Sequence, residues 1–388
     1  MSLVTDRRAP RKLLMVANYF PPMASGGNAR QLRFIRYLPE FGWEPVVLSA
    51  RCRGPVPDPP GVRIVRAAAP SPEPLYALGR SLPRLGTEAR RLSRSGGAGT
   101  RDGEPPGAGP GGGDERGQVR WPFHFSRRGL IEDWLFVPDP YVGWIVPGVL
   151  RGRRLLREER FDAIFSSYPR GSTQLIASRL AHDSGLPWLV DYRDPWPTHQ
   201  FRRFPTPLHR WAHFSLERLA LRHADEATAC NEPIADDLRR RYPALAPRVH
   251  VLSNGYDPND DIAPVELPPT SFWLVHTGRL FSRAQIVRRL LDAMAALPGD
   301  VGLLFVGVTT PFLRSYAAEL GILDRVRVEP FVPHAVARGY QRAADALLVI
   351  TGEAPESLSS KIFEYLAAGR PIVAITPPDS AAARLLAD

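Results

Sequence analysis

Short apolar segments alternate with amphipathic segments along most of this 388-residue chain. The run KLLMVAN (12–18) predicts a buried strand, and the segment 26–42 that follows carries apolar residues at helical spacing and ends at Gly42. The same order of strand and helix recurs from EPVVLSA (44–50) to PIVAIT (371–376). Because this alternation favours parallel strands joined by helices, the sequence predicts a protein of the α/β class.

Two polar segments interrupt the alternating pattern. Residues 93–120 are rich in Gly and Pro and lack apolar periodicity, which predicts a disordered insertion. The segment NGYDPNDDIAPVELPPTS (254–271) predicts a linker between two similar halves. We therefore expect domains at residues 1–262 and 263–388, with a ligand-binding cleft between them. The last helix reaches the final residue without a capping residue, so we expect the second domain to be incomplete.

The net charge of +10 arises almost entirely from arginine, because lysine occurs only at Lys12 and Lys361. A basic excess favours anionic partners such as phosphorylated substrates, nucleic acid or an acidic lipid surface. The two cysteines, Cys52 and Cys230, give neither a disulfide framework nor a metal-binding pattern. Since the first apolar run is too short for a signal peptide and no apolar stretch is long enough to cross a bilayer, we expect a cytoplasmic protein.

The segment ESLSSKIFEYLAAGRP (356–371) sets two glutamates around a serine-rich turn that opens a helix. A helix N-terminus presents unpaired backbone N–H groups and partial positive charge, and Lys361 adds a cation there. Glu356 and Glu364 are suited to accept hydrogen bonds from the vicinal hydroxyls of a sugar or a ribose. The pattern therefore favours a nucleotide-diphosphate sugar as the ligand. An amphipathic helix with solvent-facing Glu and Lys side chains is the alternative interpretation.

Two further pairs of residues follow predicted strands, where ligands of α/β proteins bind. Arg279 and Arg283 come after the strand FWLVHTG (272–278), and a solvated surface pair is the alternative to a binding role. Gly26 and Gly27 lie between the first strand and the first helix. Paired glycines let a backbone approach a ligand, although this spacing is not the dinucleotide-binding fingerprint.

The segment DYRDPW (191–196) places Asp191, Arg193 and Asp194 at the carboxyl end of another predicted strand. Two aspartates at this spacing suggest a metal, but no matching set of His or Cys accompanies them. A structural ion pair between Asp191 and Arg193 is a further alternative. We assign these three residues to the acceptor side of the cleft, with His199 as an additional candidate.

The segment 356–372 resembles the Glu-x7-Glu donor motif of retaining GT-B glycosyltransferases, in particular those of family 4. Five other segments also resemble that family and follow its usual order along the chain: 17–50, 187–196, 249–257, 274–283 and 329–350. The resemblance covers nearly the whole chain except the predicted insertion. It implies two Rossmann-like domains whose parallel sheets face each other across a cleft.

The resemblance also implies roles for individual residues. Glu364 would bind the ribose hydroxyls of the donor, and Glu356 would contact the donor sugar. Arg279 and Arg283 match a basic pair on the diphosphate, where fixed positive charge stabilises the leaving group. The implied donor site is completed by six residues of the second domain: Gly278, Val332, Ser357, Leu358, Ser359 and Lys361. Gly26 and Gly27 would lie in the cleft near the acceptor.

A retaining, metal-independent glycosyltransferase is the function that the resemblance implies. It would move a sugar from a nucleotide-diphosphate sugar to a saccharide or lipid-linked acceptor in cell-envelope polysaccharide or glycolipid synthesis, with no cofactor and no nucleic acid. A nucleotide-sugar 2-epimerase of the GT-B fold and a non-catalytic binder of sugar nucleotides or anionic polymers are the alternatives.

A location at the inner face of the cell membrane is the alternative to a freely cytoplasmic protein. The segment 121–158 is rich in Trp, Phe and Arg, which allows a peripheral membrane contact. Packing of Trp134 and Trp144 in the core is the favoured interpretation of this segment.

Overall fold

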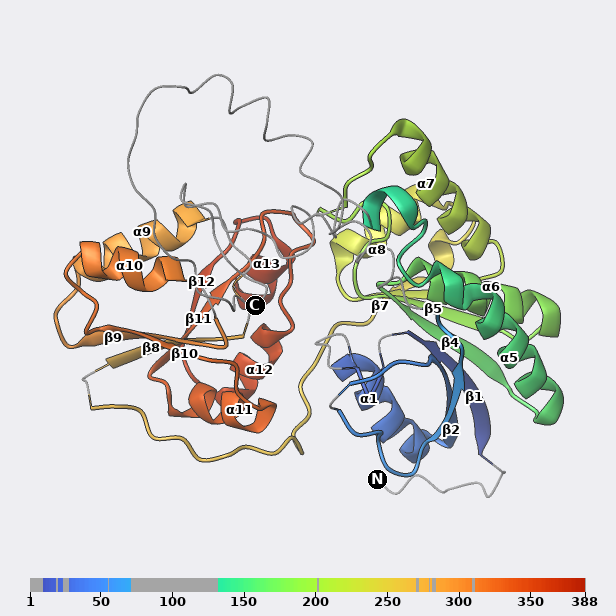
Figure 1. Cartoon of the computed structure of the whole chain (residues 1–388), viewed down its shortest axis with the longest axis horizontal. Coiled ribbons are helices and arrows are strands. Elements are labelled where there is room, and N and C mark those ends of the chain that lie inside the picture. The colour runs from blue at the N-terminus through green and yellow to red at the C-terminus, as the bar shows by residue number, and fades with distance from the viewer. Residues whose placement is uncertain are drawn as a thin grey trace, which may run out of the picture.

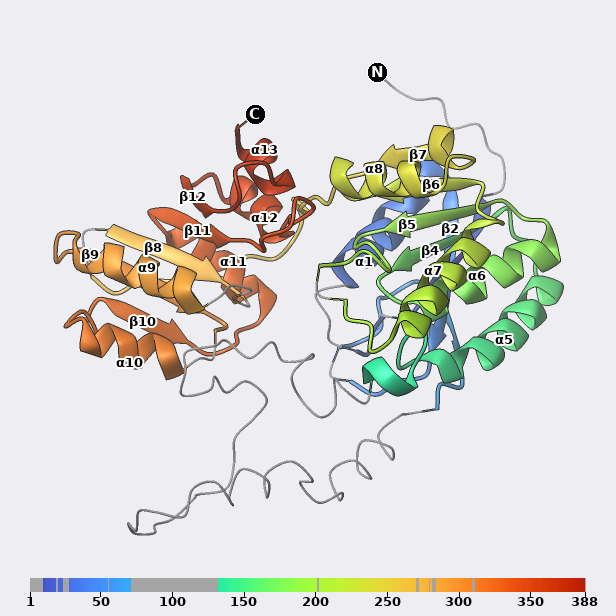
Figure 2. The same ribbon diagram turned by 90° about the horizontal axis from the view of Figure 1, so that it is seen from above.

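The computed structural model describes residues 10–18, 20–23, 28–54, 56–70, 132–200, 202–269, 272–278, 280, 284–308 and 311–387. They form two lobes that lie side by side, each built on one parallel β-sheet, as the sequence predicts (Figure 1, Figure 2). Among these described residues, we call those of 10–251 the N-lobe, those of 272–387 the C-lobe and residues 252–269 the connecting segment. The predicted boundary between residues 262 and 263 lies in the connecting segment and stays a prediction. The predicted insertion at 93–120 lies outside the described residues.

The N-lobe sheet has the strand order β3-β2-β1-β4-β5-β6-β7, and all neighbouring strands are parallel. The described strands are β1 (Arg11–Ala17), β2 (Trp43–Ala50), β3 (Arg63–Ala67), β4 (Ala163–Tyr168), β5 (Trp188–Tyr192), β6 (Glu226–Ala229) and β7 (Val249–Val251). The described helices are α1 (Asn28–Tyr37), α5 (Ile145–Glu158), α6 (Gly171–Ser184), α7 (Pro207–Leu221) and α8 (Glu232–Arg241), with short 3-10 helices η1 (Leu38–Phe41), η2 (Val142–Trp144) and η3 (Ala246–Arg248).

The C-lobe sheet has the strand order β10-β9-β8-β11-β12 and is also parallel throughout. Its described strands are β8 (Phe272–Thr277), β9 (Val301–Val306), β10 (Val326–Glu329), β11 (Ala346–Ile350) and β12 (Ile372–Ile375). Its described helices are α9 (Ala284–Ala295), α10 (Pro311–Glu319), α11 (His334–Ala343), α12 (Lys361–Ala368) and α13 (Ala381–Ala387).

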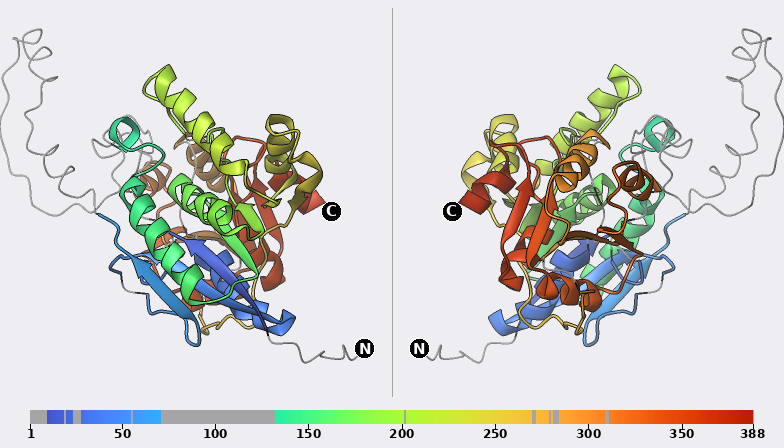
Figure 3. Two further views of the ribbon diagram at one scale, coloured as in Figure 1. Left: turned by 90° about the vertical axis from the view of Figure 1, so that its right-hand side faces the viewer. Right: turned by 90° about the vertical axis from the view of Figure 1, so that its left-hand side faces the viewer.

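Successive residues of β1 pack on opposite faces of the N-lobe sheet. Leu13 and Met15 belong to the core that α1 covers through Ile35, whereas Leu14 and Val16 belong to the larger core beneath α5 and α6. The left panel of Figure 3 shows α5 and α6 lying along this second face. Because strand side chains alternate with a period of two, covering both faces requires an unbroken apolar run, which is what the sequence of β1 supplies.

A buried ion pair joins α1 to the carboxyl edge of the N-lobe sheet. Arg30 donates from Nε and Nη2 to the two carboxylate oxygens of Asp191, at 3.1 and 2.9 Å, and both side chains are buried. Ser167 and Thr228 donate to the same carboxylate at 2.7 and 2.8 Å. Arg30 also donates to backbone carbonyls of the connecting segment. Since bidentate pairing fixes orientation, Arg30 holds α1, β5 and the start of the connecting segment in one arrangement.

The connecting segment is bonded to both lobes. On the N-lobe side, the carboxylate of Asp257 accepts hydrogen bonds from Arg36 at 2.9 Å and Tyr37 at 2.5 Å, both on α1. On the C-lobe side, the backbone N–H of Ala263 donates at 3.0 Å to a carbonyl in the first turn of α11. A Cβ on Gly339 of α11 would lie 2.1 Å from the carbonyl oxygen of Ala263. The segment therefore rests directly on the backbone of α11.

Replacing Arg30 with Met tests the buried ion pair. The variant should lose about 3 to 5 kcal/mol of unfolding free energy, because the Asp191 carboxylate would stay buried without its partner. Urea denaturation measures this loss. Arg154→Met is the control, since Arg154 pairs with Glu158 on the exposed face of α5 and such pairs contribute at most about 0.5 kcal/mol. Equal stability of the two variants would contradict the interpretation.

Candidate functional site

Each sheet has a switch point where successive crossovers leave in opposite directions, between β1 and β4 in the N-lobe and between β8 and β11 in the C-lobe. Ligands of open α/β sheets bind beyond the carboxyl ends of the strands at such points. In the C-lobe, β8 leads to Gly278 and β11 leads to residues 351–360, which we call the α12 loop. The candidate site is therefore built from this edge of the C-lobe.

Two glycines and a lysine form a compact surface beside β8. Gly278 and Gly307 have φ angles of 79° and 82°, in the left-handed region that favours glycine. A Cβ on Gly278 would lie 2.9 Å from Cε of Lys361, and a Cβ on Gly307 would lie 3.4 Å from the Cα of Gly278. Lys361 is the first residue of α12, so its ammonium adds to the partial positive charge of that helix N-terminus. This surface suits a phosphate group.

His276 orients the ammonium of Lys361. Its Nδ1 lies 2.9 Å from the carbonyl oxygen of Leu348, so this nitrogen must donate and Nε2 is left to accept. Nζ of Lys361 lies 3.4 Å from Nε2. Because His276 is buried in β8, it holds the lysine against the sheet edge next to Gly278.

Glu364 of α12 is held by two neighbours from α11. His334 Nε2 lies 3.1 Å from one carboxylate oxygen, and Gln341 Nε2 donates to the other at 3.2 Å. Gln341 also donates to Thr277 Oγ1 at 3.0 Å. Burial raises the pKa of Glu364, but the hydrogen bonds from His334 and Gln341 outweigh burial and bring the pKa below its usual value. Since a carboxylate has about four acceptor sites, these two bonds leave capacity for a pair of ligand hydroxyls.

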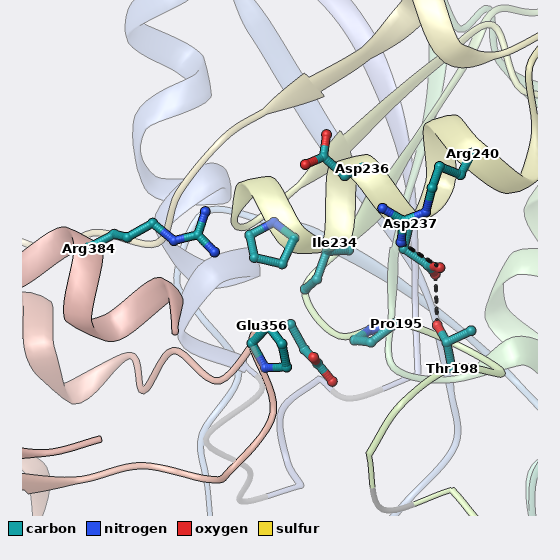
Figure 4. Close-up of a pocket in the computed structure, with 10 residues that line it drawn as sticks. Pro195, Thr198, Ile234, Asp236, Asp237, Arg240, Glu356 and Arg384 are labelled. Atoms are coloured by element: carbon teal, nitrogen blue, oxygen red, sulfur yellow. Dashed lines mark hydrogen bonds and ion pairs between the residues drawn. The ribbon is translucent and has the colours of Figure 1, made fainter. Parts of the chain in front are cut away.

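Glu356 of the α12 loop lines a pocket of about 400 Å³ between the lobes (Figure 4). The opposite wall comes from α8 and from the loop after β5, where Thr198 donates to Asp237 at 2.8 Å. Burial raises the pKa of Glu356, and the negative charges of Asp237 and Asp194 raise it further. The carboxyl of Glu356 thus faces N-lobe acids across the pocket. Its pKa is raised, whereas the pKa of Glu364 is lowered.

The remaining predicted residues of the α12 region lie in or beside the site. Ser357 is buried, and Leu358 and Val332 pack against the C-lobe core beneath α12. The hydroxyl of Ser359 accepts a hydrogen bond from the backbone N–H of Lys361 at 3.4 Å. Their roles towards a donor stay predictions.

The predicted acceptor residues of the N-lobe divide into two groups. Asp191 is fully buried, and its partner is Arg30 rather than Arg193, so the alternative of an Asp191–Arg193 ion pair is wrong. In this geometry Asp191 anchors α1 and is not exposed to an acceptor. Arg193 instead pairs with Asp194 at 3.2 Å, in a half-buried position, and His199 is half-buried in the loop that follows.

Four predicted residues, Gly26, Gly27, Arg279 and Arg283, lie outside the described residues, so their roles stay predictions. Sequence reasoning missed three residues that contact the α12 region: His276, Gln200 and Asn231. A signal for Asn231 was present, because Asn followed by Glu-Pro is a typical helix N-cap.

Metal-binding clusters and membrane-spanning helices are both absent from the described residues. Within the described ranges, no group of three or more His, Cys, Asp or Glu side chains is arranged to hold a metal ion. No helix among the described residues is long and apolar enough to cross a membrane.

Trp144 is fully buried, as predicted, but Trp134 is 54% exposed, so its predicted core packing is wrong. Trp134 instead contacts the ring of His209 at the start of α7.

Two protein-family models match the chain. The model described as Glycosyltransferase Family 4 matches residues 75–260, and the model described as Glycosyl transferases group 1 matches residues 271–386. Among curated proteins, D-inositol 3-phosphate glycosyltransferase 1 of Catenulispora acidiphila is 31% identical over 179 residues. That alignment spans 41% of this chain and 42% of the relative, which is less than half of either.

Solved structures resemble nearly the whole chain. The sucrose-phosphate synthase of Thermosynechococcus elongatus has a TM-score of 0.60 at 17% identity, covering 98% of this chain and 90% of that protein. HepE of Anabaena, solved in complex with UDP and glucose, has a TM-score of 0.54 at 15% identity, covering 97% of this chain and 83% of HepE. At such low identity these likenesses show the shared fold, which is GT-B.

The pair of His334 and Glu364 predicts a pH-dependent contribution to stability. The hydrogen bond that His334 donates to Glu364 raises the pKa of His334 above 6.5, so its stabilisation is fully present below pH 6.5 and is lost as the pH rises through the raised value. The pKa of Glu364 is below 4.5, so its stabilisation is present above pH 4.5 and is lost on further acidification. The difference in Tm between the wild type and His334→Gln should therefore be largest between about pH 4.5 and 6.5. A difference that does not vary with pH would exclude the ion pair.

Proposed function

Because the chain belongs to the GT-B glycosyltransferases of family 4, we propose that it transfers a sugar from a nucleotide-diphosphate sugar to a hydroxyl group of an acceptor. The transfer proceeds with retention of the anomeric configuration and without a metal ion. The acceptor is a saccharide or a lipid-linked acceptor of the cell envelope.

The observation that carries this proposal is the surface formed by Gly278, Gly307 and Lys361 at the N-terminus of α12. It lies at the switch point of the C-lobe sheet and combines open backbone with fixed positive charge. A diphosphate bound there would gain negative charge as the bond to the sugar breaks. Charge that is already in place stabilises that transition state without reorganisation.

The α12 region adds two glutamates, Glu364 within α12 and Glu356 in the loop that precedes it. Glu364 has a lowered pKa and remaining acceptor capacity, which supports hydrogen bonds from the two hydroxyls of a ribose. Glu356 faces the pocket between the lobes, which supports contact with the donor sugar beside the acceptor. The leaving phosphate takes the proton of the acceptor hydroxyl on the same face of the sugar. The UDP and glucose bound to HepE fit this class of donor.

The first experiment measures turnover of UDP-, GDP- and TDP-sugars by release of the nucleoside diphosphate. Lys361→Met should weaken binding of the matching nucleoside diphosphate by about 10- to 100-fold, since one charge-assisted hydrogen bond is lost. Glu356→Gln should lower kcat by about 100-fold with that affinity unchanged. Glu353→Gln, an exposed glutamate of the same loop, is the control. Proton NMR of the product reports the anomeric configuration, and inversion would refute the proposed stereochemistry.

The raised pKa of Glu356 adds a pH test. If this carboxyl acts in its ionised form, the acid limb of the kcat profile lies above pH 4.5, the usual value for the group. The limb should be absent in Glu356→Gln. A limb that persists unchanged in this variant would assign the titration to another group.

We also propose that the outer face of α7 contacts the membrane surface on which a lipid-linked acceptor lies. Leu208 and Trp211 of α7 are 68% and 66% exposed, and the exposed Trp134 lies against the same end of this helix. Arg210 and Arg218 are exposed on α7 as well. Apolar residues flanked by arginine on one helix favour an anionic interface.

Vesicles of phosphatidylglycerol and phosphatidylcholine test the membrane contact. The double variant Leu208→Ser, Trp211→Ser should sediment with such vesicles at least about tenfold less than the wild type, since it removes most of the exposed apolar area of the helix. Phe41→Ser, which removes a 72% exposed side chain elsewhere on the N-lobe, should sediment like the wild type. Binding that is lost equally in both variants would argue against a role specific to α7.

A further inference from the structure

We propose that Asn231 is a positioning residue that ties the α12 loop to the N-lobe and thereby sets the place of the Glu356 carboxyl. This inference rests on the proposed function of Glu356. Asn231 lies in the turn between β6 and α8, on the N-lobe side of the pocket, and is 6% exposed. Its side-chain Nδ2 donates to the backbone carbonyl oxygen of Glu356 at 3.0 Å.

The orientation of the Asn231 amide is fixed from within the N-lobe. Asn231 is the N-cap of α8, and its Oδ1 accepts a hydrogen bond from the backbone N–H of Ile234 at 3.1 Å. Because the cap uses the oxygen, the nitrogen is held pointing out of the helix towards the C-lobe. One buried side chain thus caps the first turn of a helix in one lobe and bonds the backbone of the other lobe.

A second hydrogen bond joins the lobes at the next residue of the loop. Gln200, from the loop after β5, donates to the buried hydroxyl of Ser357 at 3.0 Å. A Cβ on Gly352 would lie 2.9 Å from Nε2 of Gln200 and 2.8 Å from Oγ of Ser357. Gly352 and Ser357 of the loop therefore both lie close to the Gln200 side chain. The two interlobe hydrogen bonds end on consecutive residues, Glu356 and Ser357.

The C-lobe holds the rest of the loop independently of these bonds. Ser357 N–H donates to Ala354 at 2.9 Å, and Ala381 N–H of α13 donates to the carbonyl of Pro355 at 2.8 Å. The backbone carbonyl of Glu356 is the group that Asn231 bonds from the other lobe. Contact between the lobes consequently places the Glu356 carboxyl, while the phosphate surface of Gly278 and Lys361 is complete within the C-lobe.

The decisive variant is Asn231→Ser. Serine is as good an N-cap as asparagine, but its hydroxyl is too short to cap α8 and also reach Glu356. We expect kcat to fall about tenfold, the equivalent of one neutral hydrogen bond, while binding of the nucleoside diphosphate stays within about twofold of the wild type. Thr206→Ala, which removes the N-cap of α7 and leaves both Asn231 and the α12 loop unchanged in sequence, should lower Tm without changing kcat. Wild-type kcat in Asn231→Ser would overturn the proposal.

A double-mutant cycle tests the second bond. Gln200→Leu and Ser357→Ala each remove one partner, so the double variant should lose no more kcat than either single variant. Additive losses would show that the two side chains act separately and would contradict the interlobe bond.

Failure of the proposed function is separable from failure of this inference. A wild-type protein that binds no nucleoside diphosphate would refute the proposed function alone. The inference is then tested by hydrogen exchange of peptide 352–360, which should be faster in Asn231→Ser and unchanged in Thr206→Ala. Equal exchange in all three proteins would refute the interlobe tie whatever the activity.

Discussion

Parallel pairing of every strand is the constraint on which the rest of this structure depends. In each sheet all strands run in one direction, so the loops that follow them leave from one edge. Most crossovers between the described strands pass through a helix that covers the sheet, which accounts for the apolar runs of the strands and the amphipathic helices between them. The same constraint gathers Gly278, Gly307 and the α12 loop at one place, although they are separated in sequence by dozens of residues.

The fold was predictable because periodicity is a local property. KLLMVAN predicted β1, the pattern of apolar residues predicted α1, and the glutamate motif placed α12 correctly. The contacts of the site were less accessible, because they join residues far apart in sequence. Nothing near Asp191 indicates that Arg30 is its partner, and the sequence suggested Arg193, two residues away, only as an alternative.

The interlobe contacts show the same limit. The N-cap pattern at Asn231 is visible in the sequence, but its bond to the Glu356 carbonyl depends on how two lobes meet. The environment of each glutamate is likewise a tertiary property. Both are acids of one motif, yet hydrogen bonds from α11 lower the pKa of Glu364, while burial opposite Asp237 raises that of Glu356. Two carboxyls with environments that diverge in this way fit the different tasks that we propose for them, one in binding and one at the reacting sugar.

The anchoring of the connecting segment has a mechanical consequence. Asp257 is bonded to α1, Asp260 lies 3.5 Å from Arg33 of the same helix, and Ala263 rests on α11. Only Asp261 and Ile262 separate these attachments. Rotation of one lobe against the other would then be concentrated in these two residues, because the residues before them are bonded to α1 and the residue after them is bonded to α11. A small change in the backbone angles of these two residues would therefore change how the N-lobe and C-lobe walls of the pocket face each other.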